Sequence, residues 1–297
     1  MDLGNAIRTL RKKKELRLSD VNIGKTLQTL SRIESGKIIL NQNTLNQIID
    51  TLDLEPVEFY NFASKLDYPH NFVLQFRRAS GSPSDKLLRD FLLENYFKSD
   101  YQYSDISKNL MYYYSIKSHF KDEWDLKELT RNEVQHLVNH LSTRKYYGYF
   151  DYCLLCNVVI YFPDNESKLI FTKMYPIEQE NMRDSETKKY AFTAVLNVIS
   201  KRIYDGHYEE AMYYLEQSKN IDAQKSDYYF KLSIRYLENL CLFLTTHDSE
   251  YYGKLLNYIS VLRDLGDDAT ANLLKEEIEE LAFGDPNNIK DSLIKDR

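Results

Sequence analysis

Two side chains with forked hydrogen-bonding groups stand one helical turn apart near the N-terminus. Gln28 and Arg32 are four positions apart in the stretch TLQTLSRIESGK, and Leu30 and Ile33 interleave with them. This spacing predicts a short helix with one apolar face and one hydrogen-bonding face. The side-chain amide of Gln28 can make two hydrogen bonds to adenine, and the guanidinium of Arg32 can make two to guanine or to a phosphate. The polar face therefore has the chemistry to read base edges in duplex DNA.

Neighbouring residues would complete such a surface. Thr26 is the expected N-cap of the helix, and Thr29 and Ser31 can reach phosphate oxygens. Leu27 could touch a thymine methyl group or pack inward, and packing is the interpretation favoured here. Further residues are placed to contact the DNA backbone, which positions a protein without specifying sequence. These are Arg8, Arg11, Lys12, Lys37 and Asn41.

Positive charge is concentrated at the same end of the chain. Residues 1–40 contain nine Lys or Arg and four Asp or Glu, a local charge of +5, whereas the whole chain carries -6 and the remainder therefore -11. A basic head on an acidic body indicates a polyanionic partner for the head alone. The run Arg11–Lys14 taken by itself is equally consistent with a solvated surface.

The composition favours long helices, and we predict an all-α protein. Gly and Pro together make up 15 of the 297 residues, about 5%, against a usual share of roughly 12%. Within residues 1–66, apolar spacing predicts five short helices, with a short second helix near Ser19, a fourth capped by Thr44 and a fifth starting near Pro56. Gly36 is expected to end the third helix in a left-handed conformation.

The head resembles the phage-repressor type of helix-turn-helix domain. In that family the third helix enters the major groove and its N-terminal half contacts base edges. The second helix departs from the pattern, since Asn22 stands where the family usually has Ala and the stretch is about one residue short. The positions that match are Gly4, Arg8, Leu10, Arg11, Leu18, Ser19, Leu30, Ser31, Ile33, Glu34 and Gly36.

The remainder of the chain is predicted to be a helical repeat. Residues 67–84 contain two stretches rich in turn-forming residues and are expected to be a linker and a first loop. Ten helices are expected over residues 85–284, in pairs, followed by a tail at 285–297. Gly206 and Ala211 lie in a stretch that resembles the second half of a tetratricopeptide repeat, in which Gly ends one helix and Ala lets two helices approach.

A helix-turn-helix head on about five helix pairs resembles the Rgg-type regulators, a group of intracellular peptide-pheromone receptors. Phe150, Asp151, Leu154 and Asn157 match a stretch of that family, which usually reads Tyr–Glu at the first two positions. The C-terminal half is also similar to pheromone-responsive repressors of conjugative plasmids. The resemblance implies a short signalling peptide bound in the groove of the body. The candidate contacts are Arg144, Asn157, Tyr161, Asn197, Tyr204 and Arg235.

Other possible chemical groupings are interpreted as structural. Cys153 and Cys156 form a CxxC inside an apolar helix, with no second pair for a zinc site. His136 and His140 are interpreted as a surface pair, since no Glu follows as in a zinc-protease helix. No phosphate-binding loop or nucleophile motif is present in the sequence, so we expect no enzyme activity, no metal and no cofactor. No apolar run reaches the roughly 18 residues of a membrane span, and we expect a cytoplasmic protein.

Together these features predict a homodimeric transcription regulator that binds a double-stranded operator and is gated by a peptide. One rival is a repressor whose body only dimerises. A second is a helical adaptor whose head recruits protein and not DNA. A third is a head that forms a helical bundle used for dimerisation only.

Overall fold

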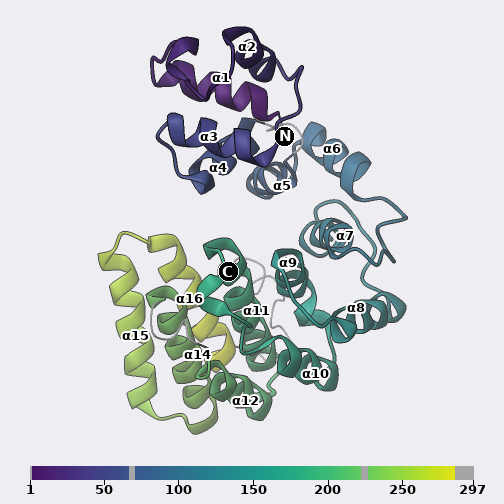
Figure 1. Ribbon diagram of the computed structural model, residues 1–297. Helices are drawn as coiled ribbons and strands as arrows, with labels where there is room; N and C mark the ends of the chain where they lie inside the picture. The colour runs from purple at the N-terminus through teal and green to yellow at the C-terminus, as the bar shows by residue number, and fades with distance from the viewer. Residues whose placement is uncertain (1, 67–70, 222–226, 285–297) are drawn as a thin grey trace. The chain divides into compact units, whose positions relative to one another are not determined.

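The computed structural model describes residues 2–66, 71–221 and 227–284, and all regular secondary structure in these ranges is helical (Figure 1). The all-α prediction is confirmed. The helices fall into two compact units, residues 1–88 and 89–297. The predicted tail and residues 67–70 of the predicted linker lie outside the described ranges.

The first unit is a bundle of short helices around one apolar core. The core is formed by apolar residues from four helices, including Ile7, Leu30, Ile48 and Phe59. Its elements are α1 (Leu3–Lys13), a 3-10 turn (Leu18–Asp20), α2 (Leu27–Glu34), α3 (Gln42–Thr51), α4 (Pro56–Leu66) and α5 (Phe72–Gly81).

Three details of this unit differ from the prediction. The second helix is a single 3-10 turn, in the stretch that is one residue short. Asn41, and not Thr44, caps α3, since its side chain accepts a hydrogen bond from the Thr44 N–H at 2.8 Å. Part of the stretch expected to be linker and loop forms α5, which buries Phe72 and Ala79. The flanking turn-forming residues concealed this ten-residue helix.

A close approach of two backbones fixes α1 against α2. A Cβ atom on Gly4 would lie 2.3 Å from the carbonyl oxygen of Ile33 and 3.1 Å from the backbone nitrogen of Gly36. Real Cβ atoms do not come this close to backbone, so only glycine fits at position 4. Gly36 itself has φ +71° and ends α2 as predicted, with the Lys37 N–H bonded to the Arg32 carbonyl at 2.9 Å.

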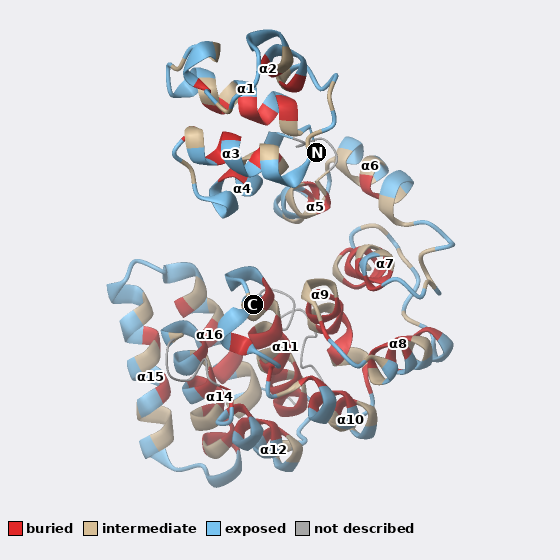
Figure 2. Ribbon diagram, in the orientation of Figure 1, coloured by how far each residue is buried: buried red, intermediate tan, exposed pale blue. Residues whose placement is uncertain are grey.

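The second unit is a two-layered helical repeat. Contacts run from α7 to α9, α11, α14 and α16 in one layer; in the other, α12 packs on α11 and α14, α15 packs on α14 and α16, and α8 and α10 pack on each other. Figure 2 shows that α9 and α11 are buried along most of their length. The elements are α6 (Lys86–Tyr96, which begins in the first unit), α7 (Ser107–His119), α8 (Arg131–Thr143), α9 (Tyr149–Val158), a 3-10 turn (Val159–Tyr161), α10 (Asp164–Met174), a 3-10 turn (Glu180–Met182), α11 (Ser185–Tyr204), α12 (Tyr208–Ser218), α14 (Tyr228–Thr246), α15 (Ser249–Asp264) and α16 (Asp268–Phe283).

The predicted repeat pair is confirmed as α11 and α12. Gly206 has φ +74° and follows α11, and the His207 N–H closes the end of the helix on the Arg202 carbonyl at 2.8 Å. Ala211 is fully buried where α12 packs on α11. Within the described residues, no helix is both long enough and apolar enough to cross a lipid bilayer.

Gly4→Ala should destabilise the first unit by about 1–3 kcal/mol, because the methyl group meets a backbone carbonyl that cannot move aside. Gly253→Ala is the matched control, since Gly253 lies inside α15 with nothing within 4 Å of its Cβ position. That change should stabilise its helix by up to about 1 kcal/mol. Thermal unfolding of the two full-length variants measures both effects. Equal shifts of the same sign would contradict the close approach.

Candidate nucleic-acid interface and ligand cavity

The outer face of α2 carries the predicted polar side chains. Gln28, Ser31 and Arg32 are exposed, whereas Leu30 and Ile33 are 3% exposed and pack on the core. The hydroxyl of Thr26 caps the helix by accepting from the Thr29 N–H at 3.3 Å. The structure therefore brings the two forked groups to one accessible surface, as the spacing predicts.

Leu27 does not pack inward, and the preferred interpretation of this residue was wrong. It is the first residue of α2 and is 55% exposed. Apolar character alone suggested burial. Helical spacing puts Leu27 on the side of Leu30, three residues further on, but it stands at the first position of α2 and is not among the core residues, so more than half of its side chain stays exposed.

Arg11, which was predicted to contact the DNA backbone, makes hydrogen bonds within the first unit. Its guanidinium donates two hydrogen bonds to Glu34, from Nε at 2.6 Å and from Nη2 at 2.8 Å, and Nη1 donates to the Leu16 carbonyl at 2.7 Å. The hydrogen bonds to Glu34 and the negative charge of that side chain raise the pKa of Arg11. A bidentate pair of this kind joins α1 to the end of α2. It uses the Nε and Nη2 donors of the Arg11 guanidinium.

The other predicted backbone-contacting residues differ in availability. Arg8, Lys12 and Lys37 are exposed. Asn41 is exposed too, but its side chain caps α3. The residues that stay candidates for DNA contact are therefore Arg8, Lys12, Thr26, Leu27, Gln28, Thr29, Ser31, Arg32 and Lys37.

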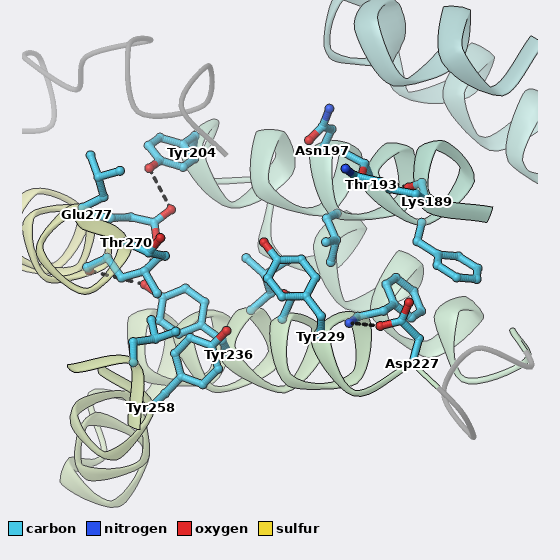
Figure 3. A pocket seen from close by; sticks show the side chains of 18 of the residues that line it. Lys189, Thr193, Asn197, Tyr204, Asp227, Tyr229, Tyr236, Tyr258, Thr270 and Glu277 are labelled. Atoms are coloured by element: carbon cyan, nitrogen blue, oxygen red, sulfur yellow. Dashed lines mark hydrogen bonds between the residues drawn. The ribbon is translucent and has the colours of Figure 1, made fainter. Parts of the chain in front are cut away.

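A cavity of about 640 Å³ lies in the second unit between α11, α14, α15 and α16. Its walls are mainly apolar and aromatic, with Phe192 from α11, Tyr229 and Phe230 from α14, and Tyr258 from α15. Figure 3 shows Tyr229 projecting from α14 into the space below α11. The volume and the mixture of apolar walls with a few polar groups are typical of sites for small molecules or peptide segments.

Three polar side chains join the helices at one end of this cavity. Tyr204 from α11 donates to Glu277 at 2.8 Å, and Tyr236 from α14 donates to the other carboxylate oxygen at 2.7 Å (Figure 3). Glu277 is 2% exposed. Hydrogen bonds to a buried carboxylate are strong, so the three residues hold α16 to α11 and α14.

Of the six residues predicted to bind a peptide, Asn197 and Tyr204 line this cavity. The Asn197 amide donates to the Cys156 carbonyl at 2.9 Å, which links α11 to α9. Asn157 lies elsewhere and donates to Ser115 on α7 at 3.0 Å. Sequence reasoning missed Tyr229, Tyr258 and Phe192, because aromatic residues at helical spacing look like ordinary core residues.

The remaining three predicted residues, like Asn157, do not line the cavity. Arg144 donates to the Asp105 carbonyl at 2.7 Å and to His140 Nε2 at 3.1 Å. Arg235 is exposed and pairs with Glu238 at 2.6 Å. Tyr161 is half-buried in the 3-10 turn after α9.

His140 is buried, which corrects its interpretation as part of a surface pair. It contacts Ser107 at 2.9 Å, and Ser107 donates to Asp151 at 2.5 Å. Burial and the nearby Arg144 charge lower the pKa of His140 to about 4. A neutral histidine is therefore part of the packing between α7, α8 and α9.

The two thiols of the CxxC lie within α9. Burial raises the pKa of Cys156 to about 12 and also raises that of Cys153. Thiolates are the reactive and metal-binding form of cysteine, and burial disfavours them here. Among the described residues, no cluster of three or more His, Cys, Asp or Glu could hold a metal ion.

An exposed recognition face in a small helical head, joined to a helical repeat, defines the class of helix-turn-helix transcription regulators. Family profiles agree with this. The C-terminal domain of the HTH-type transcriptional regulator Rgg matches residues 92–276, more than half of the chain, and a helix-turn-helix family matches residues 7–59. The chain belongs to the Rgg family of transcriptional regulators, which are not enzymes.

Solved structures share the fold over nearly the whole chain. The SHP pheromone receptor Rgg2 of Streptococcus dysgalactiae is 19% identical, with a TM-score of 0.68, over 94% of this chain and 99% of that chain. PrgX in complex with cCF10 is 19% identical, with a TM-score of 0.69, over 96% and 94%. A variant of PrgX reaches a TM-score of 0.71 at 17% identity, over 99% and 97%. No curated protein matches the chain.

Arg11→Ala should lower the free energy of unfolding of the first unit by about 1.5–3 kcal/mol, because it leaves the Glu34 carboxylate without its charged hydrogen bonds. Glu34→Ala should have a similar effect, and the double variant should be little worse than either single change. Chemical denaturation of the three variants and the parent protein measures this cycle. Additive losses would show that the two side chains do not act together.

Proposed function

We propose that this protein regulates transcription by binding a double-stranded operator through α2. The exposed Gln28 and Arg32 on one face of α2 carry the DNA part of the proposal. Gln28 presents an amide fork to adenine, and Arg32 presents a guanidinium fork to guanine. Thr29, Ser31, Arg8 and Lys37 contact the phosphate backbone around them.

The cavity in the second unit is proposed to bind a short signalling peptide that controls DNA binding. Its apolar and aromatic walls suit apolar side chains, and polar groups such as Asn197 and Thr193 can bond to peptide backbone. Family membership supports this, since the similar Rgg2 is a pheromone receptor and PrgX has been solved with cCF10. Arg144, Asn157, Tyr161 and Arg235 stay secondary candidates outside the cavity.

We further propose that the protein acts as a homodimer in the cytoplasm, where operator and re-imported peptide are both present. A dimer places two copies of α2 on a roughly palindromic site. A plasmid-borne, pheromone-responsive repressor is the second candidate, favoured by the similarity to PrgX over nearly the whole chain. A repressor that dimerises but binds no peptide is the alternative that the cavity argues against.

Arg32→Ala should weaken binding to a duplex selected from a random library by roughly 5- to 150-fold, the equivalent of 1–3 kcal/mol for one bidentate contact. Arg131→Ala, which removes one exposed charge from α8, is the control and should change affinity little. Fluorescence anisotropy at several salt concentrations measures both, and affinity should fall steeply with salt. A flat salt response, or unchanged sequence preference in Arg32→Ala, would refute the DNA interface.

Tyr229→Ala should weaken peptide binding by roughly 5- to 30-fold, because it removes an aromatic wall of the cavity. Tyr228→Ala is a matched control. Tyr228 is 77% exposed and Tyr229 is 69% exposed, but only Tyr229 lines the cavity. Calorimetry with synthetic peptides from small open reading frames beside the gene provides the measurement. Equal losses in both variants would place the peptide elsewhere, and no uptake by the parent protein would favour the dimer-only repressor.

A further inference from the structure

Leu27 is an exposed apolar side chain at the start of the helix that carries the proposed recognition residues. It is 55% exposed at the first position of α2, next to Gln28 and one turn before Ser31. The core of the first unit is complete without it, since α2 contributes Leu30 and Ile33 to that core. Packing within the unit therefore gives no reason for a leucine at this position.

We propose that Leu27 reads thymine, by covering the C5-methyl group of a thymine in the major groove. The inference rests on the proposed DNA-binding function and adds a determinant of operator sequence to it. The N-terminal end of such a helix is the part that approaches base edges. Leu27 is the first residue of that end, ahead of the two forked side chains.

The chemistry of the groove selects the base. Among the four bases only thymine presents a methyl group in the major groove, whereas the others present hydrogen-bonding groups alone at that edge. Leucine offers no donor or acceptor, so it leaves the polar edges of the other bases unsatisfied. Against thymine it removes two apolar surfaces from water at once. The operator should therefore hold a thymine beside the base pair that Gln28 reads.

The methyl group itself can be removed in the experiment. In the duplex selected from a random library by the full-length protein, each thymine is replaced in turn by deoxyuridine, which lacks only that methyl. The parent protein should lose about fourfold in affinity at one position, the effect of burying one methyl group. Leu27→Ala should bind the unmodified duplex more weakly and should be insensitive to deoxyuridine at that position.

Val57→Ala is the control, because Val57 is an apolar side chain of α4 that is 70% exposed. It should keep the parent's sensitivity to deoxyuridine. Thermal unfolding should be unchanged in Leu27→Ala, since the side chain is not part of the core.

The possible outcomes separate the two hypotheses. If the parent protein selects no duplex, the proposed DNA-binding function fails. If it binds a selected duplex but no thymine is sensitive to deoxyuridine, Leu27 reads no methyl group. If Leu27→Ala and the parent lose affinity equally at every sensitive thymine, another residue contacts the methyl and the inference is overturned.

Discussion

The paired hydrogen bonds between Arg11 and Glu34 are the constraint on which the proposed DNA-binding surface of α2 depends. They join α1 to the last turn of α2, and the Gly4 backbone lies against the same turn. With that end fixed and Leu30 and Ile33 buried, α2 has no freedom to rotate about its axis. Gln28 and Arg32 must therefore face outward. Through Glu34, Arg11 thus helps to set the direction in which Gln28 and Arg32 point.

In the second unit, polar contacts hold helices together where apolar packing is interrupted. Protein interiors are normally close-packed, so an open space between four helices leaves their side chains short of contacts. Tyr204, Tyr236 and Glu277 join three of these helices at one end of the cavity, and Asn197 joins α11 to α9. A ligand that fills the space would supply the missing contacts. This is a physical reason for the cavity to be a binding site.

Periodic features could be predicted from the sequence, whereas contacts between distant residues could not. Helical spacing located α2, because core faces repeat at a fixed interval, and resemblance to a tetratricopeptide repeat located the α11–α12 pair. The same spacing cannot show that Arg11 bonds to a carboxylate 23 positions away, or that the Leu27 side chain is exposed. The cavity was harder still to predict, because its lining residues come from four helices and meet only after these helices have packed. Asn197 was found through family resemblance, and nothing in the sequence marked Tyr229.

A ligand in the cavity can influence the rest of the body only through an element that responds to it, and it shifts an equilibrium only if it prefers one state. The inner helices provide such an element. Asn197 on α11 donates to the Cys156 carbonyl on α9, and Asn157 on α9 donates to Ser115 on α7. Successive helices are therefore linked by one asparagine amide each, in the same direction along the repeat. A displacement of α11 by a ligand would strain the first link and reach α7 through the second. If the cavity binds the peptide as proposed, Asn157 lies on the route from the cavity to α7, and it stays a candidate for contacting the peptide as well.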